Sequence, residues 1–142
     1  MRFELDTIAT PEQVLAALTD FTHRRLEIWK RTLDPKRYEL RELGDTWAVA
    51  KEASPRSPFW VVVRYDWSNP RAVRWTVVES SYGGGGEGLV TITPRDAGSH
   101  LRVEWDNTGP RQRPLLWVLH HAPLGRLIAR MYRQALDKYA AG

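Results

Sequence analysis

The stretch FWVVVRYDWSNPRAVRWTVVES, residues 59–80, decides the fold. Two runs rich in valine and aromatic residues, 59–67 and 73–80, flank the turn signal Ser68-Asn69-Pro70. Valine and aromatic side chains favour strands, and asparagine followed by proline favours a turn. The pattern predicts two neighbouring antiparallel strands joined by a short connection.

The same two-residue period extends in both directions along the chain. Toward the N-terminus it predicts strands over residues 38–43 and 46–52, separated by Gly44-Asp45. Toward the C-terminus it predicts strands over 88–93 and 100–106, with a turn at 96–99. Residues 3–9 alternate in the same way and predict a strand at the start of the chain.

Helical signals lie on either side of the six consecutive strands. Thr10-Pro11-Glu12-Gln13 is a capping box with proline at the first helical position. Thr22 can cap a second short helix, which Asp34-Pro35 ends. Residues 115–141 carry apolar side chains at helical spacing, and Pro123 and Gly125 interrupt them. We expect a first piece ending near His121 and a longer helix beginning near Pro123.

This order predicts one α+β domain over residues 1–142, with a curved seven-stranded antiparallel sheet around a long C-terminal helix, in the order β-α-α-β6-α. Seven strands span ~30 Å, and a helical segment of roughly 27 residues spans about 40 Å. The helix can therefore cross the whole sheet without covering it. Space left between sheet and helix is where small apolar ligands bind.

Three motifs resemble one superfamily. They are ATPEQV at 9–14 with Asp20, PRDAGSHL at 94–101, and PLGRL at 123–127 followed by Ala135-Leu136. Together with the element order they resemble the START-like or Bet v 1-like (SRPBCC) superfamily, and within it the polyketide cyclase/dehydrase and lipid-transport branch. The resemblance implies a helix-grip fold. It leaves activity open, because such families include ligand carriers and aromatase/cyclases.

Composition narrows the classes of protein. The 142 residues include no cysteine, which excludes disulfides, thiolate metal sites and cysteine nucleophiles. No secretory signal opens the chain, and no stretch approaches the ~20 apolar residues of a membrane span. We therefore expect a cytoplasmic protein. We expect no metal site, because no HxxxH or HExxH pair occurs. We also expect no cofactor.

The alternation of apolar and polar side chains on the strands predicts which residues bind a ligand. If the more apolar faces point inward, Tyr65, Trp67, Trp75, Glu79 and Trp105 line the concave side of the sheet. Trp117, Met131 and Tyr132 would complete an apolar wall from the C-terminal segment. Tyr65 and Glu79 would be its polar handles. The same faces are also compatible with plain core packing, with Glu79 at a strand end near solvent.

Candidates for catalysis are few. Glu79, Tyr65 or His121 would shuttle protons if the chain is an enzyme. For His120-His121 the favoured interpretation is helix-end histidines that the helix dipole stabilises. The glycine run 83–86 precedes a strand and no Gly-Lys-Ser/Thr follows, so it predicts a hairpin or a gate over the cavity rather than a phosphate loop. No serine lies in a Gly-x-Ser-x-Gly elbow, which argues against a serine hydrolase.

Three functions remain open. The first is binding or transport of a small hydrophobic molecule such as a lipid, quinone, polyketide or aromatic metabolite. The second is a polyketide cyclase or dehydratase. The third is a ligand-free interaction protein using its basic terminal helix, where Arg126, Arg130 and Arg133 share a face and could meet a membrane surface. We expect no nucleic-acid partner, because the helix should cover the sheet and no RNP-like motif occurs.

Overall fold

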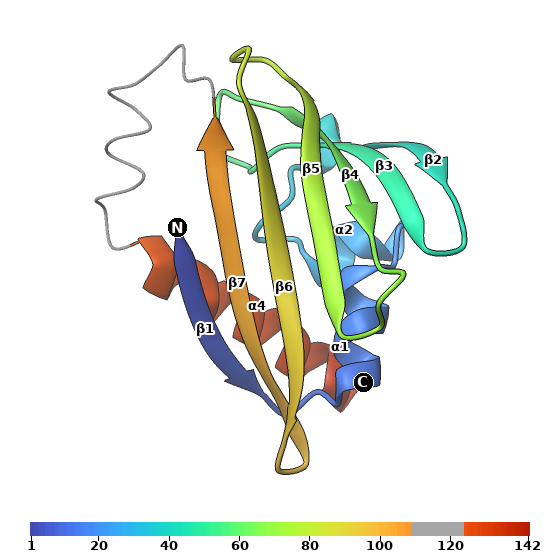
Figure 1. The fold of residues 1–142 in the computed structure, drawn as a ribbon, viewed down its shortest axis with the longest axis vertical. Helices are drawn as coiled ribbons and strands as arrows, with labels where there is room; N and C mark the ends of the chain where they lie inside the picture. Colours follow the sequence, from blue (N-terminus) through green and yellow to red (C-terminus); the bar gives the residue numbers. More distant parts are fainter. Residues whose placement is uncertain (109–123) are drawn as a thin grey trace.

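The computed structural model describes residues 1–108 and 124–142, and it has the predicted order of elements (Figure 1). One strand, two short α-helices and a turn of 3-10 helix precede six consecutive strands, and a long helix follows them. The elements are β1 (Arg2–Thr7), α1 (Pro11–Leu18), α2 (Arg24–Ile28), η1 (Pro35–Arg37), β2 (Glu39–Leu43), β3 (Trp47–Glu52), β4 (Val61–Asp66), β5 (Ala72–Ser80), β6 (Gly85–Arg95), β7 (Gly98–Thr108) and α4 (Leu124–Ala141).

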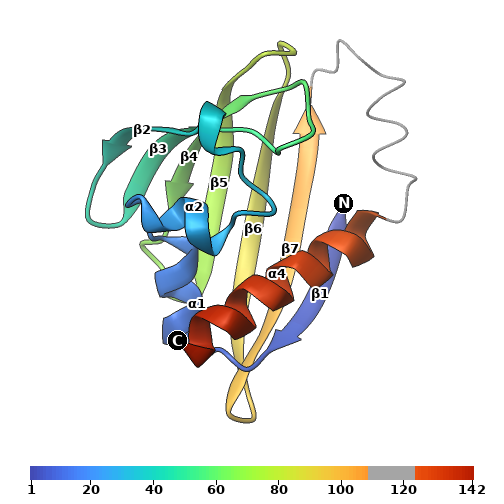
Figure 2. The same cartoon turned by 180° about the vertical axis from the view of Figure 1, so that it is seen from behind.

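The seven strands form one antiparallel sheet in the order β1-β7-β6-β5-β4-β3-β2. Six strands, β2 to β7, follow one another as hairpins. Strand β1 lies at the edge of the sheet opposite to β2 and pairs with β7, which places Phe3 opposite Val103. The sheet curves, and the described helices α1, α2 and α4 lie on its concave side (Figure 2). The predicted α+β helix-grip architecture is therefore confirmed.

Helix α1 begins where the capping box predicts. The Thr10 backbone amide donates to Gln13 Oε1 at 2.9 Å, and the Gln13 amide donates to Thr10 Oγ1 at 3.2 Å. Pro11 occupies the first turn, where its missing amide proton costs no hydrogen bond. Helix α4 begins at Leu124, next to the predicted start near Pro123. The first helical piece, predicted to end near His121, falls outside the described residues.

A β-bulge interrupts the pairing of β4 with β5. Val63 pairs with Val77 and Val62 pairs with Glu79, so Val78 is an extra residue on β5. The bulge reverses which residues of β5 face inward beyond this point. Val78 itself is 56% exposed.

The core lies between α1, α4 and the β1–β7–β6 part of the sheet. Helix α4 crosses this part diagonally and contacts β1, α1 and α2 (Figure 2). The fully buried side chains of this core include apolar residues from all three layers: Val14, Ile92, Leu101, Val103 and Leu136. Toward β3 and β4 the sheet curves away from α4, and the space there is bounded by α2 instead.

None of the described helices is long and apolar enough to span a membrane.

Candidate functional site

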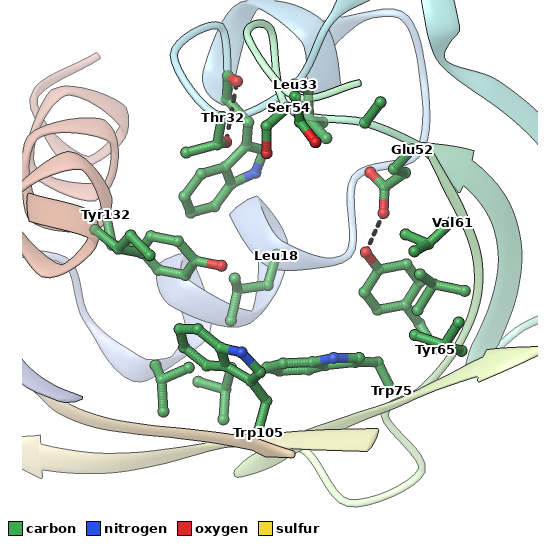
Figure 3. Close-up of a pocket in the computed structure, with 18 of the residues that line it drawn as sticks. Leu18, Thr32, Leu33, Glu52, Ser54, Val61, Tyr65, Trp75, Trp105 and Tyr132 are labelled. Carbon is green, nitrogen blue, oxygen red and sulfur yellow. Dashed lines mark hydrogen bonds between the residues drawn. The ribbon is translucent and has the colours of Figure 1, made fainter. Parts of the chain in front are cut away.

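A cavity of about 510 Å³ lies between the concave face of the sheet, α2 and α4 (Figure 3). The sheet supplies side chains that alternate inward from β3, β4, β5, β6 and β7, and the helices supply the opposite wall. Most of the lining is apolar. Its polar residues include Arg25, Glu52 and Tyr65 on one side and Tyr132 on α4. The main lining residues are Leu18, Arg25, Trp29, Thr32, Glu52, Val61, Val63, Tyr65, Val73, Trp75, Val77, Val90, Val103, Trp105, Ile128, Met131 and Tyr132.

Two indoles form the wall on the side of the sheet. Trp75 and Trp105 lie next to each other between Tyr132 and Tyr65 (Figure 3). The Trp75 ring lies directly over Gly88, its cross-strand partner, where an added Cβ would overlap the ring. Glycine at this position lets the indole lie flat against the backbone of β6. The wall is therefore a broad aromatic surface suited to a flat apolar ligand.

A buried ion pair forms the polar end of the cavity. Arg25 Nε donates to Glu52 Oε2 at 3.0 Å, and the two side chains are 7% and 5% exposed. The Tyr65 hydroxyl donates to the other oxygen of Glu52 (Figure 3). Arg25 Nη1 also donates to the carbonyl of Leu18 at 3.0 Å, which joins the pair to the end of α1.

Several contacts fix the position of Arg25 over the cavity. Its guanidinium lies 4.1 Å from the centroid of the Phe21 ring and 5.3 Å from that of Tyr65. Burial disfavours the charge of Arg25, but the Glu52 carboxylate more than offsets this, and the net effect raises the pKa of Arg25. The guanidinium therefore stays charged and paired.

Two tyrosines face each other across the cavity. Burial, reinforced by the Glu52 carboxylate, raises the pKa of Tyr65 well above its usual range. Burial also raises the pKa of Tyr132 to about 12. Both phenols therefore stay protonated near neutral pH. The Tyr132 hydroxyl points into the cavity, and no hydrogen bond joins it to the other residues drawn in Figure 3.

Five residues of the predicted ligand-binding set lie together in the cavity wall. Tyr65 on β4, Trp75 on β5 and Trp105 on β7 face inward from the sheet. Met131 and Tyr132 face them from α4. The alternation of the strands and the helical spacing predicted these placements.

Glu79 is not in the cavity, and its predicted inward placement is wrong. The extra residue Val78 turns the Glu79 side chain to the outer face, where it is 57% exposed and lies 3.5 Å from Arg41. The carboxylate is thus a surface charge. It is in no position to serve as a polar handle or to exchange protons with a molecule in the cavity.

Trp67 lies inside the fold but is not part of the cavity wall. Its ring stacks on Phe21, with centroids 5.7 Å apart and an interplanar angle of 15°. Phe21 and Trp67 thus pack together in a second buried cluster with Ala48 and Ala50. The predicted ligand-binding role of Trp67 is replaced by packing that closes the cavity at the α1–α2 connection.

Trp117 and His121 lie outside the described residues, so their predicted places in the wall and in proton transfer are not addressed by the structure. Arg126, Arg130 and Arg133 are exposed on α4, and Arg133 lies 3.6 Å from Asp137. Among the described residues no group of three or more His, Asp or Glu side chains could hold a metal ion.

Sequence reasoning missed Arg25 and Glu52, the charged pair in the wall. Glu52 shares its face of β3 with Ala48 and Ala50, both fully buried. The opposite face of β3 carries Trp47 and Val49. Because that face is the more apolar one, the sequence pattern did not indicate that the face with Glu52 points inward. Arg25 precedes Trp29 by four residues, and that helical spacing was the available signal for a buried arginine.

The fold and the cavity define a class: small helix-grip proteins with an internal ligand space. The family model described as "Polyketide cyclase / dehydrase and lipid transport" matches residues 4–141. The chain therefore belongs to this family, within the superfamily that its motifs resemble. A search of curated proteins found no significant match.

Solved structures of low sequence identity share the fold. Protein TTHA0849 from Thermus thermophilus is 16% identical, with a TM-score of 0.74 over 99% of this chain and 96% of that one. The Zhui aromatase/cyclase from Streptomyces sp. R1128 is 17% identical, with a TM-score of 0.73 over 100% and 96% of the two chains. Norcoclaurine synthase from Thalictrum flavum is 11% identical, with a TM-score of 0.69 over 97% and 83%.

Proposed function

We propose that the protein binds a small, largely apolar molecule in the cavity between its sheet and α4. The observation that carries this proposal is the cavity itself, about 510 Å³ with a mostly apolar lining and few polar groups. Ligand sites of proteins have this size and character. The family, which covers polyketide cyclases, dehydrases and lipid transport, supports the same reading.

Affinity would come chiefly from removing apolar surface from water, at about 25 cal/mol per Å². Trp75 and Trp105 offer the largest continuous apolar surface, and Met131 and Ile128 face them from α4. Methionine adapts its shape to irregular partners. The few polar groups would orient the molecule, since an unpaired polar group in such a site is costly.

The first experiment is native mass spectrometry of gently purified protein, followed by denaturing extraction. A discrete extra mass that disappears on denaturation supports the proposal and gives the chemical class of the ligand. In parallel, the neutral fluorophore N-phenyl-1-naphthylamine should bind with a rise in emission as it enters an apolar site. No bound mass together with no binding of this probe would overturn the proposal.

A pair of valine variants locates the binding. Val77 lines the cavity, and its neighbour Val78 lies outward on the bulge. Val77→Phe should weaken N-phenyl-1-naphthylamine binding by about tenfold, because the larger side chain takes up cavity volume. Val78→Phe adds the same side chain on the outer face and should leave the affinity unchanged. Equal effects of the two variants would place the binding elsewhere.

A cyclase or dehydratase is the second candidate, favoured by the carboxylate–phenol pair of Glu52 and Tyr65 at the cavity wall. A carboxylate and a phenol within hydrogen-bond reach of a substrate can act as general base and acid. Turnover of a poly-β-ketone analogue that is lost in Tyr65→Phe, with the fluorophore still bound, would favour this candidate. Binding without turnover in the wild type would favour the carrier.

A further inference from the structure

Among the described residues, the polar end of the cavity carries no net charge. Arg25 and Glu52 are nearly fully buried and joined by a 3.0 Å ion pair. Arg31, the other charged residue in the described part of the lining, is exposed and donates to Gln134 at 2.7 Å. Solvent therefore screens Arg31, and the buried wall presents a neutralised pair. An ionised ligand would lose its hydration there without meeting an opposite charge.

Tyr65 and Glu52 in this wall offer acceptors to a ligand. Tyr65 gives its one proton to Glu52, so its oxygen can only accept a further hydrogen bond. Each Glu52 oxygen takes one described hydrogen bond and can accept another. Arg25 donates from Nε to Glu52 and from Nη1 to the carbonyls of Leu18 and Asp20, and its Nη2 carries two further N–H groups.

The opposite wall offers a hydroxyl with a proton to give. Tyr132 points into the cavity across from Tyr65 and Glu52, with the indoles of Trp75 and Trp105 between them (Figure 3). Its ring is fixed by edge contact with Phe3, at 5.5 Å between centroids, and by Trp29, at 5.0 Å. A molecule lying on the indoles would thus meet acceptors at one end and a donor at the other.

We propose that the cavity selects a neutral molecule with a flat ring system and a hydroxyl group, which donates its proton to the Glu52–Tyr65 pair. This inference rests on the proposed ligand-binding function and narrows its ligand class. An ionised fatty acid is disfavoured by charge. A quinone accepts hydrogen bonds only, so it suits Tyr132 but leaves the acceptors opposite without a partner.

Three naphthalenes of similar shape test the inference by isothermal titration calorimetry near neutral pH. 2-Naphthol carries a hydroxyl donor, 2-methoxynaphthalene an acceptor only, and 2-naphthoate a negative charge. The wild type should bind 2-naphthol about tenfold more tightly than the ether, as expected for a hydrogen bond to a charged group. It should bind 2-naphthoate more weakly than both.

A change of charge in the wall should alter this order. Glu52→Gln leaves the positive charge of Arg25 unpaired at the cavity, so 2-naphthoate should gain at least about tenfold in affinity relative to 2-naphthol. Glu79→Gln is the matched control, because it makes the same change in an exposed ion pair on the outer face. It should keep the wild-type order.

The outcomes separate the two proposals. Equal affinities for the three naphthalenes, or tightest binding of 2-naphthoate by the wild type, would overturn the inference and leave ligand binding standing. Failure of all three compounds and of N-phenyl-1-naphthylamine to bind would overturn both. If Glu52→Gln does not fold by circular dichroism, the wild-type order alone decides. A folded Glu52→Gln that keeps the wild-type order contradicts the assigned role of the wall.

Discussion

Arg24 and Arg25 are neighbours in the chain with opposite surroundings. The Arg24 side chain is 62% exposed and lies 4.0 Å from Asp20, whereas Arg25 is buried against Glu52. A surface pair contributes little to stability, because water screens it. Removing one partner of a buried pair is costly, because the other charge is left in an apolar environment.

Arg25→Met should therefore lower the free energy of unfolding by about 3–5 kcal/mol. Arg24→Met, the same substitution one residue earlier, should stay within about 0.5 kcal/mol of the wild type. Urea denaturation followed by circular dichroism measures both. Similar small losses in the two variants would mean that Glu52 finds solvent or another partner when Arg25 is absent.

Single residues also show where sequence reasoning succeeds and where it stops. Tyr65, Trp75 and Trp105 were placed correctly, because a regular strand turns alternate side chains to the same face. Glu79 was misplaced, because a bulge adds a residue without changing the apolar pattern of VVES at 77–80. The partnership of Arg25 with Glu52 joins two elements, and no local pattern encodes it.

Among the elements, the hairpin of β5 and β6 shapes the cavity most directly. Trp75 lies flat because Gly88 opposite it has no side chain. Gly125 in α4 provides a contrast, since a Cβ there would lie 3.7 Å from the Cβ of Phe3, an ordinary contact. Two glycines in regular structure thus differ in what an added methyl group would meet.

Gly88→Ala should push the Trp75 ring out of its place and destabilise the protein by about 1–3 kcal/mol. It should also weaken N-phenyl-1-naphthylamine binding and shift the tryptophan emission. Gly125→Ala should be neutral or stabilising by up to about 1 kcal/mol, because alanine favours a helix. Urea unfolding and fluorescence titration report these effects. An unchanged affinity in Gly88→Ala would show that the indole position does not matter for binding.

The boundaries of elements were predicted unevenly, for physical reasons. The start of α1 was correct because its capping box is a local signal with its own hydrogen bonds. Strand β6 begins at Gly85, three residues earlier than predicted, because pairing with β7 extends through Gly86 opposite Asn107. Glycine disfavours strands intrinsically, and here the ladder with β7 overrides that preference.

At the scale of the whole molecule, His100 connects β7 to β1 on the outer face. Its Nδ1 lies 2.7 Å from Asp6 Oδ1 and its Nε2 lies 3.2 Å from Glu4 Oε1. Arg95 Nη1 also donates to Asp6 Oδ1, at 3.3 Å. The hydrogen bonds to Asp6 and Glu4 raise the pKa of His100, and the bond from His100 lowers the pKa of each carboxyl.

This arrangement gives stability a pH dependence of known sign. Folding raises the pKa of His100. The stability that this adds is fully present below the unfolded-state pKa of about 6.5, and it is lost as pH rises through the folded-state pKa. The lowered pKa values of Asp6 and Glu4 add stability that is lost only as pH falls through those values. The contribution of the cluster is therefore largest in mildly acidic solution.

His100→Gln should remove the part of this dependence above about pH 6. The difference in urea midpoint between the wild type and the variant should be largest in mildly acidic solution and shrink as the solution becomes alkaline. Arg64→Gln, which alters an exposed ion pair with Asp66 on β4, outside this cluster, is the control and should preserve the dependence. A constant difference across the series would contradict the role of His100.

The pairing of β1 with β7 also bears on how the chain acquires its structure during translation. Phe3 is paired with Val103, so β1 leaves the ribosome long before its partner strand has been made. Contacts between residues so distant in sequence slow folding, and an unpaired strand is open to wrong associations in the meantime. Helix α4, which packs on β1, is synthesised later still. Among the described strands, β1 is therefore synthesised first and is among the last to complete its contacts.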